Sequence, residues 1–291
     1  MSGVRLTRPR LALPFTVVAD GETVHLIAGE DLRYSIRAGE MTARFAELLR
    51  HCDGIQTFDI LLNKLAEDER DAASKLIERL YGERILVNGP VELFHRAELY
   101  QAVSEGCGPL YDRQVFSTIK SPMSAESATQ ADLLSSNKHR PIFVLYQNTL
   151  DYHTAGEFNR RHLGAGDSPW MWVTTGPSSR GYVSPVFLPD AGPCLTCLLR
   201  HFQRLSPVPK LYDALVDHGE KGNEFHPMPF PEEALTILEQ IATWKIRQMS
   251  DTRPSSAIFQ LHVLELDDMD VSVHRVFVDP TCPDCHDARL V

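Results

Sequence analysis

Two pairs of cysteines constrain this chain more than any other feature. Each pair has the spacing C-x-x-C: Cys194 and Cys197 lie in "GPCLTC", and Cys282 and Cys285 lie in "PTCPDC". Four thiolates are the ligand set of a tetrahedral structural zinc site, and two distant pairs close one site when the fold brings them together. The Gly-Pro and Pro-Asp turns beside the pairs suit a metal knuckle. We therefore predict one zinc site held by all four cysteines, with iron as the minor alternative.

A C-x-x-C pair has two other uses. In a redox site one pair stands at a helix start, as Cys194 does, but the second pair then has no purpose. "PCLTC" also matches half of the zinc deaminase signature, which needs a His-x-Glu upstream. The only His-x-Glu, His218-Gly219-Glu220, lies downstream. Because a closed four-cysteine site has no open position for water or substrate, we interpret it as structural rather than catalytic.

The composition is that of an ordinary soluble protein. The chain has 291 residues, of which 43% are hydrophobic and 23% charged, enough for one large domain or two ordinary ones. The formal net charge of −10 argues against a dedicated nucleic-acid binder. No secretion signal and no apolar run of membrane-spanning length is seen, so we expect a cytoplasmic protein whose thiols stay reduced, with no membrane partner.

The first ninety residues predict a small α/β module. Residues 13–37 alternate apolar and polar side chains between turn signals, which indicates three antiparallel strands. Helical spacing follows, with Gly54 expected to stop the first helix and Thr57 to cap a short second one. A third helix runs into a closing strand. We interpret this order as a winged-helix-like domain over residues 1–92.

Charge distinguishes two uses of such a module. The acidic run Glu67-Asp68-Glu69 at the start of the third helix would repel the phosphates of DNA. The third strand instead presents an edge that an extended peptide can join. An acidic peptide would then meet four cations, on the third strand and the third helix: Arg33, Arg37, Lys75 and Arg79. We therefore favour peptide binding over DNA binding.

Residues 93–291 alternate helical segments with apolar strands, which predicts βαβ units and a largely parallel sheet. The segments "SAIFQLHVLEL" and "VSVHRVFV" predict a terminal β-hairpin. No G-x-G-x-x-G and no G-x-x-x-x-G-K-[ST] is present, so the nucleotide-binding loops of such folds are missing. The remaining cysteines, Cys52 and Cys107, are expected to be small buried apolar residues.

Together these features resemble a known family. "VSPVFLPDAGPCLTCLLRHFQRLS" and "VHRVFVDPTCPDC" resemble the E1-like (ThiF-like) partner protein of azol(in)e-forming cyclodehydratases. They are most similar to the zinc-binding B subunit of microcin synthetases. The resemblance implies a leader-recognition domain over 1–92 and a degenerate Rossmann-like E1 domain over 93–291 with a structural Zn²⁺. It covers most of the chain and is weakest over 93–140.

The resemblance also implies a function. Such subunits bind the leader of a ribosomal precursor peptide and present its Cys, Ser and Thr residues to a separate ATP-dependent YcaO-type subunit, which forms the thiazole or oxazole rings of bacteriocin-type products. A flavin-dependent azoline dehydrogenase often follows, and a homodimer within a larger complex is expected. Catalytic residues are not expected in this chain. The family's leader groove maps to about Asp31–Arg37 and Asp68–Leu80, which adds three strand residues to the peptide-binding set: Leu32, Tyr34 and Ile36.

Three other interpretations stay open. An E1-like enzyme that adenylates a small carrier protein is disfavoured by the missing glycine loop. A zinc-stapled winged-helix regulator of transcription would bind duplex DNA in a salt-dependent manner. A purely structural interaction protein would lack a peptide groove.

Overall fold

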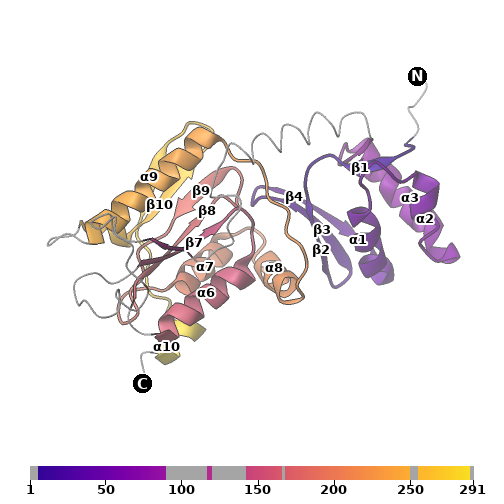
Figure 1. Cartoon of the computed structure of the whole chain (residues 1–291). Helices are drawn as coiled ribbons and strands as arrows, with labels where there is room; N and C mark the ends of the chain where they lie inside the picture. The colour runs from indigo at the N-terminus through magenta and orange to yellow at the C-terminus, as the bar shows by residue number, and fades with distance from the viewer. Residues whose placement is uncertain (1–5, 90–116, 120–141, 166–167, 250–254, 289–291) are drawn as a thin grey trace. The chain divides into compact units, whose positions relative to one another are not determined.

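A computed structural model describes residues 6–89, 117–119, 142–165, 168–249 and 255–288 of the chain (Figure 1). The chain is a mixed α/β protein that divides into two compact units. Unit 1 comprises residues 1–105 with 224–229, and unit 2 comprises 106–223 with 230–291. The domain boundary expected at residue 92 lies outside the described residues, as does Cys107.

Unit 1 contains the three strands, three helices and closing strand that the sequence predicts, preceded by a short strand, β1, that it does not predict. Its elements are β1 (Pro9–Leu11), β2 (Thr16–Asp20), β3 (Thr23–Ala28), β4 (Leu32–Arg37), a 3-10 turn (Gly39–Met41), α1 (Thr42–Arg50), α2 (Phe58–Leu62), α3 (Glu67–Gly82) and β5 (Leu86–Asn88). The three predicted antiparallel strands are confirmed as one sheet in the order β2-β3-β4. The closing strand β5 pairs with β1 and stands outside that sheet.

One apolar core holds unit 1 together. Alternation along β3 buries Val24 and Leu26, and the helical spacing of α1 buries Phe45, all at 0% exposure. Ile77 of α3 belongs to the same core, and Met228, from the segment 224–229, packs against it. The core of unit 1 is therefore built from the first ninety residues and is contacted by one short segment from the second half of the chain.

The predicted helix ends are partly right. Thr57 caps α2 as expected, because its hydroxyl accepts a hydrogen bond from the backbone N–H of Ile60 at 3.4 Å. The expected stop of α1 at Gly54 is wrong. The helix ends at Arg50, and Gly54 lies in the following loop with a φ of 80°.

Unit 2 is built on one six-stranded sheet in the order β11-β10-β9-β8-β7-β6. Its elements are β6 (Ser117–Ile119), β7 (Ile142–Gln147), α6 (Tyr152–Ala165), β8 (Trp170–Thr174), β9 (Arg180–Val183), α7 (Leu195–Leu205), α8 (Lys210–Glu220), α9 (Glu232–Met249), a 3-10 turn (Ser256–Phe259), β10 (Leu261–Glu265), β11 (Val271–His274) and α10 (Pro283–Ala288). Figure 1 shows α9 against one face of this sheet and α6 and α7 against the other. None of the described helices is long and apolar enough to cross a bilayer.

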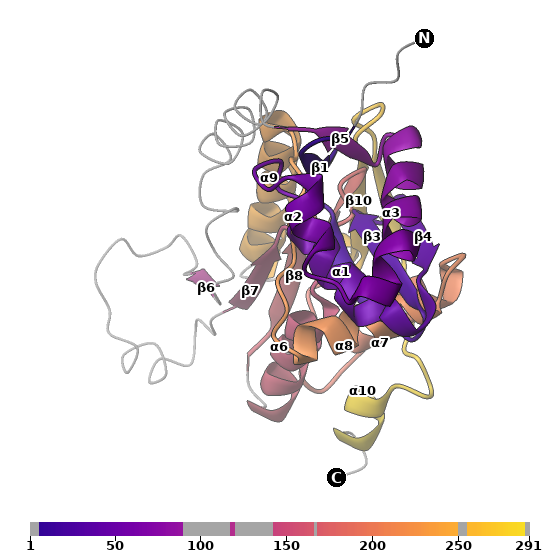
Figure 2. The ribbon, with the colours of Figure 1, turned by 90° about the vertical axis from the view of Figure 1, so that its right-hand side faces the viewer.

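The expectation of a largely parallel sheet is wrong for the described strands. Only β7 and β8 pair in parallel, as the two strands of one β7–α6–β8 unit seen side by side in Figure 2. The other ladders are antiparallel, including the predicted C-terminal hairpin of β10 and β11. Because helices cover both faces, the strands read as continuous apolar runs whatever their direction. The strand expected over 182–188 ends at Val183, and Phe187 makes only an isolated bridge with Trp170.

A buried lysine joins two strands of the sheet. Lys245 of α9 has 0% exposure. Its ammonium donates hydrogen bonds to the carbonyl oxygens of Ser184 and Gln260, each at 2.6 Å. Burial lowers the pKa of Lys245 to about 7, while the carbonyl oxygens favour its charged form. The side chain thus holds the end of β9 to the start of β10.

Candidate metal centre and peptide-binding edge

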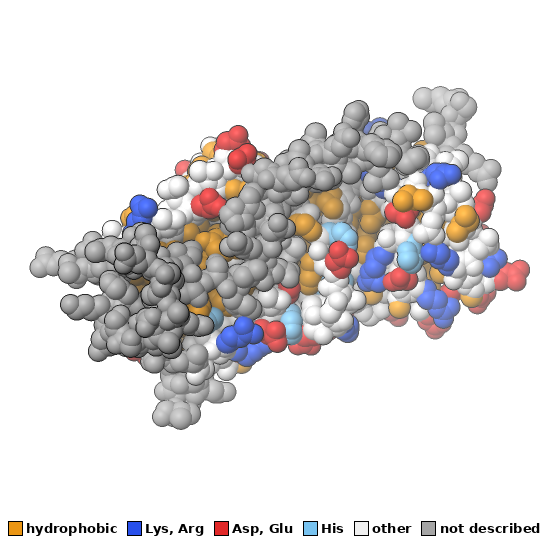
Figure 3. Space-filling view, viewed as in Figure 1, with side chains coloured by type: hydrophobic (Ala, Val, Ile, Leu, Met, Phe, Trp, Pro, Cys, Tyr) orange, Lys and Arg blue, Asp and Glu red, His pale blue; other side chains and the backbone are white. Residues whose placement is uncertain are grey.

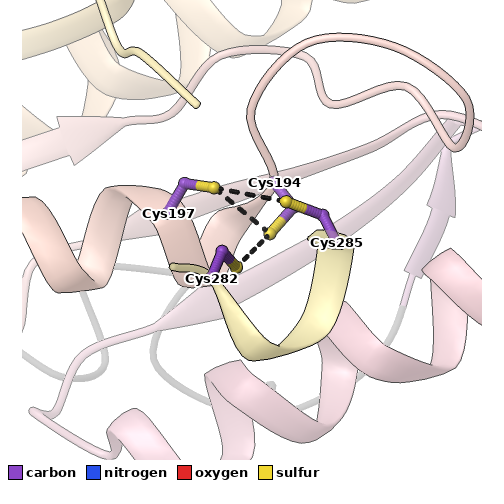
Figure 4. A group of neighbouring side chains, drawn as sticks. All are labelled: Cys194, Cys197, Cys282 and Cys285. Atoms are coloured by element: carbon purple, nitrogen blue, oxygen red, sulfur yellow. Dashed lines mark hydrogen bonds between the residues drawn. The ribbon is translucent and has the colours of Figure 1, made fainter. Parts of the chain in front are cut away.

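The fold brings the four paired cysteines together. Cys194 is the N-cap of α7 and Cys197 lies in its first turn, whereas Cys282 precedes α10 and Cys285 lies within it. Figure 4 shows their sulfur atoms pointing toward one another, and all four lie within 4.8 Å of each other. The Sγ–Sγ distances are 3.8 Å for Cys194–Cys197, 3.6 Å for Cys194–Cys282 and 3.5 Å for Cys197–Cys285.

These distances fit a cation coordinated tetrahedrally by the four sulfur atoms. Four sulfur atoms at about 2.3 Å from a central ion lie about 3.8 Å apart along each edge of a tetrahedron. The three separations given above are within a few tenths of an ångström of that value, and no disulfide joins the cysteines. All four cysteines are buried. The donor set is therefore closed on all sides, as in structural rather than catalytic metal sites.

Hydrogen bonds and burial shift the pKa values of the clustered cysteines in opposite directions. Hydrogen bonds from Cys194 and Cys282 lower the pKa of Cys197, and the backbone N–H of Asp279 adds another at 3.4 Å. Desolvation, in contrast, raises the pKa of Cys285 to about 12. Buried thiolates with no cation would repel one another, so a bound metal resolves the conflict between burial and charge.

A buried carboxylate locks the two halves of the cluster. The side chain of Asp279 has 0% exposure and accepts hydrogen bonds from Arg200 Nε at 2.6 Å and Arg204 Nη2 at 2.5 Å, both on α7. Thr281 Oγ1 donates another at 2.9 Å. Burial alone would raise the pKa of Asp279, but the hydrogen bonds from Arg200 and Thr281 hold it at about 2. Asp279 therefore ties the segment before Cys282 to the helix that carries Cys197.

A second polar network ties the cluster to α6. Asn159 of α6 accepts a hydrogen bond from the backbone N–H of Leu195 at 2.9 Å and donates to the carboxylate of Asp284 at 2.9 Å. Thr196 Oγ1 donates to the same carboxylate at 2.5 Å. Sequence reasoning missed Asn159 and Asp279 as supports of the site. The run "VDPTCPDC" holds Asp279 and Asp284 beside the cysteines, but nothing in the sequence marks Asn159, because only the fold brings it near.

The turn after β7 is where a nucleotide would bind in an open α/β sheet, at the carboxyl ends of parallel strands and the start of the following helix. Here the carboxylate of Asp151 fills that helix start: it accepts hydrogen bonds from the N–H and the hydroxyl of Thr154 at 3.0 and 2.6 Å. The loops that follow β7 and β8 are also in contact, since a Cβ on Gly176 would lie 2.3 Å from the carbonyl oxygen of Thr149. A buried carboxylate in the anion position disfavours a phosphate.

The predicted peptide-binding strand lies at an edge. Within the described residues β4 pairs with β3 alone. On the opposite edge, the hydroxyl of Thr16 in β2 accepts a hydrogen bond from the backbone N–H of His226 at 2.9 Å. Leu32 of β4 is 45% exposed, while Ile36 is 6% exposed and packs in the core. Tyr34 is half-buried against that core, which Ile77 of α3 also enters.

Most of the predicted peptide-binding cations have acidic neighbours. Arg37 pairs with Glu22 at 2.9 Å, Lys75 with Asp71 at 2.6 Å and Arg79 with Glu83 at 2.8 Å. Figure 3 shows basic and acidic side chains interspersed over the visible face of unit 1. These ion pairs are exposed and therefore weak, so an acidic ligand can take the place of the acidic partner in each pair. In the described part of the chain Arg33 forms no ion pair within 4.0 Å.

No known family model matches this sequence, and no curated protein matches it. The chain is similar to three solved structures in particular. For the heterocyclase TruD, identity is 17% and the TM-score 0.39, over 96% of this chain and 43% of that one. For the E. coli microcin synthetase McbBCD complex, identity is 15% and the TM-score 0.39, over 94% of this chain and 99% of that one. For E. coli MccB, identity is 10% and the TM-score 0.37, over 95% of this chain and 96% of that one.

The chain spans less than half the length of the TruD chain. All three TM-scores are below 0.5.

Proposed function

We propose that this chain is a non-catalytic, zinc-stapled scaffold subunit of a peptide heterocyclase. In this proposal unit 1 is a winged-helix-like domain that binds the leader of a ribosomal precursor peptide. Unit 2 is a degenerate Rossmann-like E1 domain whose four cysteines hold a structural Zn²⁺. The Cys, Ser and Thr residues of the peptide are modified on a separate ATP-dependent YcaO-type subunit.

The observation that chiefly carries the non-catalytic role is the closed turn after β7. Asp151 occupies the helix start that would otherwise receive a phosphate, and its carboxylate is hydrogen-bonded to Thr154. The loops after β7 and β8 approach each other closely there, since a Cβ on Gly176 would lie 2.3 Å from the carbonyl oxygen of Thr149. Together with the absence of a glycine-rich loop from the sequence, this disfavours the alternative of an enzyme that adenylates a carrier protein.

The peptide-binding role is supported by the edge of β4. An extended leader can add a strand there through its backbone, while Leu32 offers an apolar contact and Arg33 and Arg37 offer positive charge. Lys75 and Arg79 of α3 would add charge from the helix. Ile36 is buried, so its part is to anchor the strand to the core.

Such a subunit works by tethering. A bound leader holds the core of the peptide near the partner's active site and raises its effective concentration there to about millimolar for a short flexible linker. The partners that fit this role are the YcaO-type subunit, a flavin-dependent azoline dehydrogenase acting afterwards, and a second copy of this chain.

The leader-binding proposal predicts the effect of reversing charge on β4. The double variant Arg33→Glu/Arg37→Glu should bind an acidic leader peptide about 10-fold or more weakly than the wild type, because attraction becomes repulsion beside the added strand. Fluorescence anisotropy with a labelled leader peptide measures the affinity.

The matched control is compared with each single variant, Arg33→Glu or Arg37→Glu, because it makes the same change of charge elsewhere on unit 1. Lys64 is exposed and lies outside β4 and α3, so Lys64→Glu should change the affinity much less. Equal losses of affinity in Lys64→Glu and in the single β4 variants would show that only net charge matters and would place the groove elsewhere. Salt-sensitive retention of the wild type on duplex DNA would favour the regulator interpretation instead.

A further inference from the structure

A short proline-rich segment leaves unit 2, enters unit 1 and returns. Residues 224–229 belong to unit 1, although the chain on both sides of them, 106–223 and 230–291, belongs to unit 2. Residues 223–231 form neither a helix nor a strand. We call residues 226–231, "HPMPFP", the strap. The strap therefore spans the point at which the chain passes from unit 1 back into unit 2.

Each unit holds one apolar side chain of the strap. Met228 packs against the core of unit 1. Phe230, two residues further on, is 1% exposed and belongs to unit 2. Its ring lies against Gly181 of β9, where an added Cβ would lie 3.1 Å from the ring's Cζ atom. The strap is therefore anchored in both units, and only Pro229 separates the two anchors.

The prolines make the strap stiff. Proline fixes its own φ and pushes the residue before it toward extended conformations. Prolines stand at every second position of the strap, 227, 229 and 231, so each of its residues is restricted in one of these two ways. Proline-rich spacers are semi-rigid, whereas glycine-rich spacers behave as flexible coils. A movement of one anchor is therefore passed to the other with little slack.

The strap also contacts the sheet of unit 1, at the edge opposite β4. The backbone N–H of His226 donates a hydrogen bond to Thr16 Oγ1 of β2 at 2.9 Å. Thr16 lies directly opposite Ile27 of β3, and Ile27 lies directly opposite Arg33 of β4. One row of the sheet thus runs from the strap to the strand where the proposed function places the leader. The strap holds the sheet that would carry the peptide.

We propose that the strap positions unit 1 for presentation of the peptide. It limits the movement of unit 1 relative to unit 2, and so keeps the core of a leader-bound peptide within reach of the partner subunit. Met228 and Phe230 are positioning residues, which act on ring formation without contacting the peptide. A restrained tether that matches the span gives a higher effective concentration than a loose one. The positioning role rests on the proposed function, whereas the restraint itself does not.

Distances between the two units test the restraint. Ketone-bearing amino acids at the exposed positions of Lys64 and Asp217 take spin labels without the use of cysteine. Double electron–electron resonance on the full chain then gives the distribution of distances between the labels. We expect Pro227→Gly/Pro229→Gly to widen this distribution roughly 2-fold, because glycine lets the strap adopt many conformations. Met228→Ser, which removes one anchor and keeps the prolines, should widen it as well.

The chain offers a matched control for the glycine variant. The run "PVP" at 207–209 has the same spacing as "PMP" at 227–229, but it joins α7 to α8 within unit 2. Pro207→Gly/Pro209→Gly therefore makes the same two substitutions outside the strap and should leave the distribution unchanged. Circular dichroism spectra that match the wild type exclude misfolding as the cause of any widening.

Ring formation with a YcaO-type subunit and a precursor peptide tests the positioning role. We expect the strap variants to bind the leader within about 2-fold of the wild type and to form rings roughly 5-fold more slowly at saturating peptide. A distribution that stays unchanged, or that the control widens equally, would overturn the restraint. Widening without slower ring formation would overturn the positioning role. If the wild type bound no leader, the proposed function would fail, while the distances would still decide whether the strap restrains unit 1.

Discussion

Replacing one cysteine of the cluster should remove the metal and destabilise unit 2. We expect the purified wild type to carry one zinc ion per chain and Cys197→Ala to carry none, because three buried thiols no longer close a tetrahedron. Metal binding adds directly to folding free energy, so the variant should lose about 4 kcal/mol or more, equivalent to about 10 °C in melting temperature for a chain of this size. Elemental analysis and thermal unfolding measure both effects.

Cys52 provides the matched control. It is 4% exposed and lies in the core of unit 1, where desolvation raises the pKa of its thiol to about 12. Cys52→Ala therefore makes the same chemical change at a buried position, and we expect it to keep the full metal content. A Cys197→Ala protein that retained one zinc ion per chain, or a wild type free of zinc and iron, would contradict the assignment of the cluster as a metal site.

Removing the charge of Asp279 should have the next largest effect. The variant Asp279→Asn keeps the shape of the side chain but leaves Arg200 and Arg204 without their shared carboxylate. Breaking a buried ion pair is costly, and because the arginines are partly exposed we expect a loss of about 2–3 kcal/mol in the free energy of unfolding. Zinc affinity should fall about 10- to 100-fold, since the segment before Cys282 is no longer held in place.

Urea unfolding and competition with a chromophoric zinc chelator measure these two losses. Asp217 of α8 is exposed and forms no ion pair within 4.0 Å in the described residues, so Asp217→Asn should alter neither quantity appreciably. If Asp279→Asn matched this control in both measurements, the carboxylate would contribute neither to stability nor to zinc affinity. The cluster would then be held by the cysteines and Asn159 alone.

Local patterns predicted unit 1 well for physical reasons. Alternation with period two and helical spacing each identify one buried face, so β2, β3, β4 and the body of α1, though not its end, follow from the sequence. The same patterns cannot identify which strands pair or which distant segments of the chain pack together. The pairing of β5 with β1, and the packing of Met228 on a core built mostly from the first ninety residues, depend on contacts between distant segments.

Strand direction in unit 2 could not be predicted for a different reason. Burial on both faces removes the alternation that separates parallel from antiparallel strands, so the runs of β8 and β10 read alike. The cysteine spacing, in contrast, predicted the cluster because metal chemistry demands four convergent donors. The supports Asp279 and Asn159 serve the same site through ordinary hydrogen bonds, which leave no signature in the sequence.

The closed turn at Asp151 also became visible only in the structure. The sequence showed that a glycine-rich loop is missing, and the fold showed what stands in its place: a carboxylate hydrogen-bonded to Thr154 at the start of α6. Both observations support the proposal that a separate subunit, and not this chain, uses the nucleotide.

The most direct test of the scaffold role is a cyclisation assay with a precursor peptide and ATP, following ring formation by mass spectrometry and nucleotide turnover by phosphate and pyrophosphate release. The purified chain alone should form no rings and consume no ATP, whereas adding a YcaO-type subunit should give ring formation that depends on this chain and on the leader. Ring formation or adenylate production by the chain alone would contradict the account and identify it as an enzyme.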